Sequence, residues 1–453
     1  MDIIIVGCGK LGMELTQRLT AEGHDITVVD EDVKQVQTVV SMYDAQGIEG
    51  NGASYKVLQE AGVESAELLI AVTNSDELNL LCCLIAKRSS KCPTIARVRN
   101  PVYREEIQFI KEGLGLDMII NPEFESASEI SRILRRKSVL DINPFAKGRV
   151  ELMRFRIPEN SVLDQRQIVS IAMRLKADVL VTAVERENKV TIPSGGFELR
   201  SGDIVTILAT PVNASDFFAK IGIADNAART CIIVGGGMHG FYLATELLNM
   251  GTNVKIIEKS AARCDELSIL LPKAVVINAD GTDENVLLEQ GLDYSDSFVA
   301  LTNRDEENIL LSLYAIQNSD TKVVTKLNRV NFDSVVEKMD LGTVIYPKSI
   351  TADSIIRYVR ARNNSKDASE VETMYRIIGN RVEALEFIIK EPSFITGERL
   401  VDLKIKNNTL VGCITRDGQS FIPRGKDTIQ VGDSVVIITT IQGVGTIQGF
   451  FNK

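Results

Sequence analysis

A glycine-rich loop between a predicted strand and a predicted helix occurs twice in this chain of 453 residues. Residues 3–30 read IIIVGCGKLGMELTQRLTAEGHDITVVD, and residues 231–258 read CIIVGGGMHGFYLATELLNMGTNVKIIE. Each stretch runs from an apolar strand through G-x-G-x-x-G to a helix, a second apolar strand and a terminal acid. The two acids, Asp30 and Glu258, are 258 − 30 = 228 residues apart, and so are the first glycines of the two loops.

The duplication extends well beyond these loops. Residues 68–79 (LLIAVTNSDELN) match residues 297–308 (SFVALTNRDEEN), and residues 190–203 (VTIPSGGFELRSGD) resemble residues 420–433 (SFIPRGKDTIQVGD). The separation between equivalent residues drifts only from 228 to 230 (433 − 203 = 230), which chance cannot supply. One half of the chain is therefore a copy of the other, and the length favours four domains in the order A–B–A–B.

Each residue type in the first loop has a physical role in binding a nucleotide. Gly7 permits a tight turn, Gly9 lets the backbone approach a pyrophosphate, and Gly12 lets the helix pack close to the strand. The phosphates would lie on the free N–H groups at the start of the helix. Asp30 can accept hydrogen bonds from a ribose diol. A glycine-rich turn required only for packing is the alternative.

Further candidate residues follow the next strands of the same predicted sheet. Thr73 and Asn74 come directly after the strand 68–72, at the edge where doubly wound sheets bind their ligands. The following strand, 94–98, carries Arg97, and its partner in the second half is Lys326. A cation at this position could neutralise phosphates or pair with a nearby carboxylate, and the sequence leaves both open.

Alternating strands and helices predict a parallel sheet with helices on both faces. After residue 150 the pattern changes to short strands (153–157, 178–185, 189–192 and 204–209) around one helix, 163–171. A break at Asn143-Pro144 predicts a linker over residues 141–148. We therefore expect an α/β chain with two Rossmann-like doubly wound domains, each followed by a linker and a small α+β lobe: residues 1–137, 138–225, 226–362 and 363–453.

The composition excludes several classes of function. A net charge of −10 and a pI near 5.1 disfavour nucleic acid and anionic lipid as partners, because both need a basic footprint. Seven cysteines without a C-x-x-C, and only two histidines, predict neither a disulfide framework nor a metal site. No run approaches 18 apolar residues and the chain enters its first strand at once, so we expect no membrane span and no signal peptide.

An NAD-dependent dehydrogenase is the alternative from another class of protein. Hydride transfer needs a positioned acid–base group, commonly His, Lys or Tyr. His24 lies in the turn before the second strand and His239 lies inside the second glycine loop, neither where a substrate carbonyl would bind. No Y-x-x-x-K occurs. We therefore expect a chain that is not an enzyme.

The tandem order of glycine loop, L-x-A-V-T-N-x-D-E-x-N-like junction and I-P…G-D lobe resembles the RCK (regulator of K⁺ conductance) family over essentially the whole chain. The resemblance implies a cytosolic regulatory subunit, peripheral to the inner face of the cell membrane, that binds NAD or NADH, or else ATP or ADP. It implies an integral-membrane potassium transporter of the Trk type as partner, with a sensor for another channel or transporter as the alternative. A ring of eight such units recurs in the family, so two units per chain imply a homotetramer.

The resemblance also implies which residues contact the nucleotide. In the first copy they are Gly7, Cys8, Gly9, Lys10, Leu11, Gly12, Asp30, Asn51, Gly52, Thr73, Asn74 and Arg97. In the second copy they are Gly235, Gly236, Gly237, Met238, His239, Gly240, Glu258, Asp280, Gly281, Thr302, Asn303 and Lys326.

The second copy departs from the first in ways that predict unequal sites. Glu258 is one methylene longer than aspartate and is followed by Lys259. Met238 and His239 add bulk to the second glycine loop. The two sites therefore need not hold the same ligand.

Overall fold

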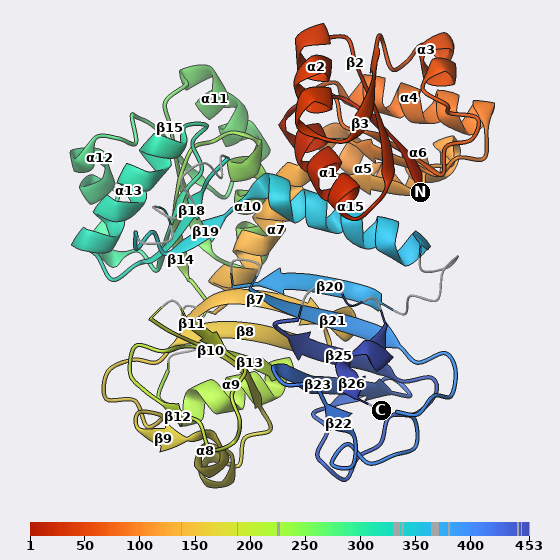
Figure 1. Cartoon of the computed structure of the whole chain (residues 1–453). Helices are drawn as coiled ribbons and strands as arrows, with labels where there is room; N and C mark the ends of the chain where they lie inside the picture. Colours follow the sequence, from red (N-terminus) through yellow and green to blue (C-terminus); the bar gives the residue numbers. More distant parts are fainter. Residues whose placement is uncertain are drawn as a thin grey trace. The chain divides into compact units, whose positions relative to one another are not determined.

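The computed structural model describes residues 1–136, 138–187, 189–223, 227–328, 336, 339–363, 371–378, 381–441, 444 and 446–452 (Figure 1). Its contacts divide the chain into a sheet unit, Met1–Ile130 with Cys231–Ile356, and a lobe unit, Ser131–Thr230 with Arg357–Lys453. The expected domain boundaries at residues 137, 225 and 226 lie outside the described residues, and the four domain ranges stay predictions.

The first copy of the sheet unit, red to orange in Figure 1, is built on a parallel sheet of six strands. Its order is β3 (Ala45–Glu49), β2 (Asp25–Asp30), β1 (Asp2–Val6), β4 (Leu68–Ala71), β5 (Thr94–Arg97), β6 (Met118–Ile120). This is the 3-2-1-4-5-6 order of a doubly wound dinucleotide fold. Helices cover both faces, so β1 and β4 are buried runs of aliphatic residues rather than alternating ones. The helices are α1 (Lys10–Ala21), α2 (Val33–Met42), α3 (Tyr55–Glu60), α4 (Asp76–Ser89), α5 (Pro101–Glu105), α6 (Ile107–Leu114) and α7 (Pro122–Leu134).

The second copy, green to cyan in Figure 1, repeats this sheet strand for strand. Its order is β16 (Val275–Asn278), β15 (Asn253–Glu258), β14 (Thr230–Val234), β17 (Ser297–Ala300), β18 (Lys322–Lys326), β19 (Thr343–Ile345). Its described helices are α10 (Met238–Asn249), α11 (Ala261–Leu270), α12 (Glu284–Glu289), the 3-10 turn η2 (Leu292–Tyr294), α13 (Asp305–Asn318) and α15 (Pro347–Asn363). The predicted tandem of parallel-sheet domains is confirmed.

Within the sheet unit, each copy contacts the other through the helix that follows its sixth strand. Asn121, at the start of α7, donates to the hydroxyl of Tyr242 on α10 (3.1 Å), and this hydroxyl donates to the Arg99 carbonyl (2.6 Å). The ring of Phe124 meets the Tyr242 ring edge-on at 5.8 Å. In the other direction, Asp353 on α15 pairs with Arg18 on α1.

The lobe unit contains two five-stranded sheets whose described strand pairs are antiparallel. The first has the order β11 (Lys189–Thr191), β10 (Leu180–Arg186), β13 (Ile204–Ala209), β8 (Val150–Arg156), β7 (Val139–Phe145). The second has the order β20 (Val371–Ile377), β21 (Val382–Ile388), β25 (Ser434–Thr439), β23 (Thr409–Arg416), β24 (Gln419–Phe421). The remaining elements are η1 (Ala146–Gly148), β9 (Arg166–Gln167), α8 (Ile168–Leu175), β12 (Glu198–Leu199), α9 (Pro211–Lys220), β22 (Lys404–Ile405), η3 (Ile447–Phe450) and β26 (Phe451–Asn452).

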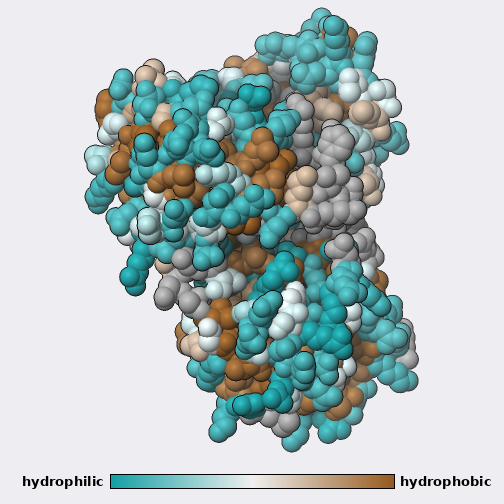
Figure 2. Space-filling model, turned by 90° about the vertical axis from the view of Figure 1, so that its left-hand side faces the viewer, coloured by the Kyte–Doolittle hydropathy of each residue, from teal (hydrophilic) through white to brown (hydrophobic). Residues whose placement is uncertain are grey.

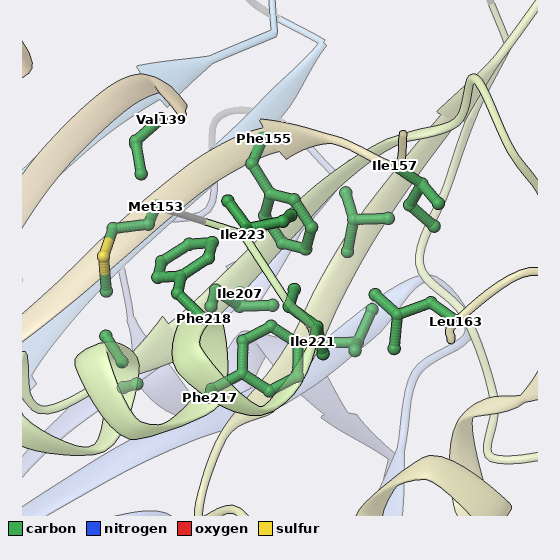
Figure 3. Close-up of a cluster of buried hydrophobic side chains, with 14 of the residues drawn as sticks. Val139, Met153, Phe155, Ile157, Leu163, Ile207, Phe217, Phe218, Ile221 and Ile223 are labelled. Atoms are coloured by element: carbon green, nitrogen blue, oxygen red, sulfur yellow. The ribbon is translucent and has the colours of Figure 1, made fainter. Parts of the chain in front are cut away.

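Aromatic and branched side chains fill the first lobe between its sheet and α9. Phe155 on β8 meets the rings of Phe217 and Phe218 edge-on at 6.0 and 5.2 Å, with Ile207 beside them (Figure 3). A separate cluster joins the lobes, because Phe145 and Leu152 of the first pack with residues of the second such as Ala384 and Ile438. The two lobes therefore share part of their core.

Three expectations about the first lobe are wrong. The lobe contains two helices where one was expected, because α9 follows β13, with Thr210 capping its first turn and Pro211 at its start. The predicted linker at Asn143-Pro144 is strand β7, which pairs with β8; proline is tolerated because β7 is the edge strand of its sheet. The predicted helix 163–171 begins only at Ile168. Before it, the Ser161 hydroxyl accepts from the Leu163 amide at 3.3 Å and the Ser161 carbonyl accepts from the Asp164 amide at 3.0 Å, local bonds that favour a turn over a helix. Residues 166 and 167 then pair with β12 as strand β9.

Across the described residues, none of the helices combines the length and the apolar character that a membrane crossing requires.

Candidate nucleotide-binding sites

The structure distinguishes the three glycines of the first loop. Gly7 has φ +107°, and a Cβ on Gly12 would lie 1.9 Å from the Gly7 carbonyl oxygen, so the backbone itself demands both glycines. A Cβ on Gly9 would meet no atom within 4 Å, and φ of −65° suits any residue. Packing therefore explains Gly7 and Gly12 but leaves Gly9 unexplained, whereas close approach of a pyrophosphate explains it.

The second loop repeats this geometry. Gly235 has φ +109°, and a Cβ on Gly240 would lie 2.2 Å from the Gly235 carbonyl oxygen. A Cβ on Gly237 would again meet nothing within 4 Å. Both loops thus keep one glycine that faces open space at the start of a helix, which fits a bound diphosphate.

The helices that start at these loops have no side-chain cap at their N-termini. Gly9 and Gly237 are the N-cap residues of α1 and α10, and neither helix carries an acid in its first turn. Side chains cap α2, α4, α11 and α12, whereas α3, α6 and α13 lack a side-chain cap, as α1 and α10 do. Free N–H groups at a helix start bind anions, so α1 and α10 retain this capacity for a ligand.

The terminal acids are tied to the loops that they face. Asp30 accepts hydrogen bonds from the amides of Cys8 (2.6 Å) and Asp32 (2.9 Å), one on each carboxylate oxygen. Burial, followed by the charge of Asp30, raises the pKa of Cys8 to about 12, so this thiol stays protonated. Glu258 accepts from the amides of Gly236 and Ser260, both at 2.8 Å. Each carboxylate oxygen retains lone pairs that can accept from a ribose diol.

In each copy, the turn after the third strand lies at the edge of the sheet where the strands have their carboxyl ends. A Cβ on Gly52 would lie 2.2 Å from Val6, and one on Gly281 would lie 2.4 Å from Val234, so close packing explains both glycines. The Asn51 side chain accepts from the Ala53 amide at 2.8 Å, as in an Asx turn. Its counterpart Asp280 accepts from Lys259 and from Thr282, and these bonds lower the pKa of Asp280.

Buried asparagines that sequence reasoning left without a role hold the ends of the fourth and fifth strands. The Asn79 side chain accepts from both the amide (2.8 Å) and the hydroxyl (2.7 Å) of Thr73, and donates to the Arg97 carbonyl (2.9 Å). Asn308 makes the same three bonds to Thr302 and Lys326. This asparagine recurs in both copies of the sequence, and that recurrence was the signal that could have identified its structural role.

These contacts bring the predicted residues of each site together. A Cβ on Gly7 would lie 2.9 Å from the Thr73 amide nitrogen, so the loop and the end of β4 are adjacent. The Asn74 carbonyl accepts from Arg99, whose own amide donates to Asp76 at 2.8 Å. Asp76, in the first turn of α4, thus fixes the loop after β5.

Of the cations at the ends of the fifth strands, Lys326 is buried and Arg97 is half-buried. Arg97 pairs with Glu123 at 3.2 Å, which favours the carboxylate alternative for this residue. Lys326 donates to the Leu301 carbonyl at 3.3 Å, and burial lowers its pKa to about 8. Burial, with smaller effects from the charges of Lys326 and Arg97, lowers the pKa of His239 to about 3, so the imidazole is neutral. Phosphate contacts of these side chains stay a prediction.

The remaining predicted residues offer backbone groups or exposed side chains. Leu11 and Gly240 are buried, so only their amides can serve a ligand. Met238 is half-buried, while Lys10 and Asn303 are exposed at the starts of α1 and α13.

Comparison with known proteins agrees with this duplicated architecture. The TrkA-N domain matches residues 3–122 and 231–347, and the TrkA-C domain matches residues 152–222 and 384–452. The chain is 30% identical to the Trk system potassium uptake protein TrkA homolog 1 of Methanosarcina mazei over 460 residues, 100% of both chains. It is 30% identical to the Trk system potassium uptake protein TrkA of Halomonas elongata over 440 residues, 96% of this chain and 95% of that one.

A solved structure, the GsuK channel bound to NAD, shares the fold with a TM-score of 0.63 and 17% identity, covering 99% of this chain and 77% of that chain. The predicted resemblance and fold class are confirmed by matches that run in the same order along both halves. The chain belongs to the TrkA family.

Proposed function

We propose that this chain is a regulatory subunit that binds NAD or NADH at its glycine loops and gates a Trk-type potassium transporter from the cytoplasmic face of the membrane. One observation carries the proposal: Gly9 and Gly237 face open space at the start of uncapped helices, beside acids bound to the same loops. The names of the relatives support potassium uptake as the process. ATP or ADP would satisfy the same phosphate and ribose contacts.

Regulation would follow from differential binding. A nucleotide shifts a protein between two arrangements only if its affinity for them differs. Both loops lie in the sheet unit, where α10 contacts the other copy through Tyr242. A ligand on the N-terminus of α10 therefore acts on a helix that joins the two copies, and this contact is a candidate route for the signal.

The purified chain is expected to bind NADH without consuming it. In this proposal the glycine loops and their acids supply the anion and ribose contacts, and the imidazole of His239, within the second loop, is held neutral. Calorimetric titration with NADH, NAD, ATP and ADP measures binding, and absorbance at the nicotinamide band measures turnover with a range of carbonyl compounds. Steady NADH oxidation would overturn the regulatory function. Co-purification with a co-expressed Trk-type transporter tests the partner.

Assembly into a homotetramer forms part of the proposal. Helix α6 (IQFIKEGL) buries none of its residues, and its Phe109 is 77% exposed. Leu81 on α4 and Leu310 on α13 occupy equivalent positions of the two copies, and both are exposed. The face of the molecule in Figure 2 likewise shows hydrophobic patches within a mostly hydrophilic surface. Exposed apolar side chains that recur at equivalent positions of both copies are candidates for contacts between chains.

Light scattering of the wild-type chain is expected to give four times the chain mass of 49.8 kDa. Phe109→Ser combined with Leu310→Ser should lower this mass, because it removes two exposed apolar side chains. Val212→Ser, at an equally exposed residue of α9, is the matched control and should leave the mass unchanged. A monomeric wild-type chain at micromolar concentration would contradict the assembly.

A further inference from the structure

The segments that follow the two terminal acids carry opposite charge. Residues 30–35 read DEDVKQ, with three consecutive carboxylates at their start. Residues 258–263 read EKSAAR, in which the acid is followed by a lysine and, at the end, Arg263. Because each acid is tied to its glycine loop in the same way, the two segments occupy corresponding places beside the ribose position.

Arg263 is held against the second glycine loop. Its Nε donates to the Gly236 carbonyl at 2.8 Å, and its Nη1 pairs with Glu266 at 2.6 Å. Its Nη2 is buried and has no hydrogen-bond partner among the residues that the structure describes. In the first copy the corresponding residue is Gln35, which is exposed. A guanidinium with a spare donor therefore lies beside the second loop, where the first copy has an uncharged amide.

The glycine at position 236 is part of this arrangement. A Cβ there would lie 2.5 Å from the Leu267 side chain and 3.1 Å from Glu258 Cβ. The corresponding residue of the first loop is Cys8, which is accommodated. The second loop thus packs more closely against α11, the helix that carries Arg263, and against the acid.

This difference bears on the 2′ position of the adenosine ribose. The terminal acid of a dinucleotide fold faces the 2′-hydroxyl, and a nearby arginine accommodates a 2′-phosphate instead. A phosphate monoester carries about −1.5 to −2 charges near pH 7. In the first copy it would meet the carboxylates of Asp30, Glu31 and Asp32, which repel it.

In the second copy a single carboxylate, Glu258, stands where the first copy has three in a row. Both oxygens of Glu258 accept a backbone N–H at 2.8 Å, and those of Asp30 likewise accept one each. The Lys259 side chain is 78% exposed and pairs with Asp280 at 2.6 Å. An exposed ion pair contributes little to stability, so the ammonium can turn to a phosphate at little cost.

We propose that the second site accepts a dinucleotide with a 2′-phosphate, the NADP(H) class, and that Arg263 determines this specificity. The first site takes only an unmodified ribose. The inference rests on the proposed function, that both glycine loops bind nucleotides. A role of Arg263 limited to bracing Gly236 is the competing explanation.

Calorimetric titration of the full chain with NADPH and with NADH separates these explanations. The wild type is expected to bind NADPH at one site per chain and NADH at two. Arg263→Gln, which installs the residue of the first copy, should lower NADPH affinity about 10- to 100-fold, as for loss of a charge-assisted hydrogen bond, and change NADH affinity less than about threefold. Gln35→Arg is the matched control and should leave NADPH binding at the second site unchanged.

Arg263→Lys keeps the positive charge but loses the planar fork of the guanidinium. Its NADPH affinity should lie between those of Arg263→Gln and the wild type, and its NADH affinity should be unchanged. Equal losses of NADPH and NADH affinity in Arg263→Gln would overturn the inference in favour of the brace. A wild-type chain that binds NADH but not NADPH would also overturn it and leave the proposed function intact. A chain that binds neither would contradict the proposed function itself.

Discussion

Tyr242→Ala is expected to destabilise the sheet unit by about 3–5 kcal/mol, the usual cost of removing a buried aromatic side chain. Tyr242 is fully buried and contacts Phe124, and its hydroxyl bonds to Asn121 and to the Arg99 carbonyl. Much of the contact between the two copies would be lost with it. Tyr242→Phe keeps the ring and should cost only about 1–2 kcal/mol, because Asn121 also donates to the Arg99 carbonyl at 3.3 Å.

Tyr294→Ala is the matched control, since Tyr294 is 89% exposed and its loss should change stability by less than about 0.5 kcal/mol. Calorimetric unfolding together with hydrogen exchange in residues 118–130 and 238–249 measures the effect. Exchange is expected to accelerate in both segments of Tyr242→Ala. Unchanged exchange in the two segments would mean that the copies do not make this contact in solution.

The repeat made most of the architecture predictable from the sequence. Strand 204–209 has the predicted bounds. Both parallel sheets have the predicted doubly wound order. Their strands were recognisable because buried parallel strands read as unbroken aliphatic runs. The edge strand β7 lacked this signal: Asn143-Pro144 read as a break because proline cannot donate to a sheet, yet an edge needs no donor there.

Contacts between distant segments could not be predicted. The partner of Arg97 is Glu123, which reaches it only because β5 and β6 pair side by side and α7 starts at the end of β6. The pairing of Tyr242 with Asn121 joins the two copies over 121 residues, and no local pattern encodes it.

The Gly-Asp pair that recurs in the two lobes has a structural role that the sequence did not reveal. Asp203 is buried and accepts two bonds from Arg186, both at 2.7 Å. Asp433 accepts the corresponding bonds from Arg416 at 2.8 and 2.7 Å. The sequence showed the repetition of the aspartates, but the arginines 17 residues earlier in each copy became partners only through the strand pairing.

The double variant Gly9→Ala, Gly237→Ala tests the central claim that the glycine loops are nucleotide sites and not packing turns. Neither new Cβ would meet a protein atom within 4 Å, and both residues have φ near −60°, so the fold should be unaffected. Each methyl would stand where a pyrophosphate approaches the backbone, and loss of one charge-assisted hydrogen bond per site lowers affinity about 10- to 150-fold. Gly12→Ala is the contrasting control: its Cβ would lie 1.9 Å from the Gly7 oxygen, so it should lower stability.

The decisive measurement is the NADH binding isotherm of this double variant beside that of the wild type, with thermal unfolding as the check on folding. The account predicts an unchanged unfolding temperature and a loss of affinity of at least about 10-fold at both sites. A folded double variant that binds NADH as tightly as the wild type would contradict it.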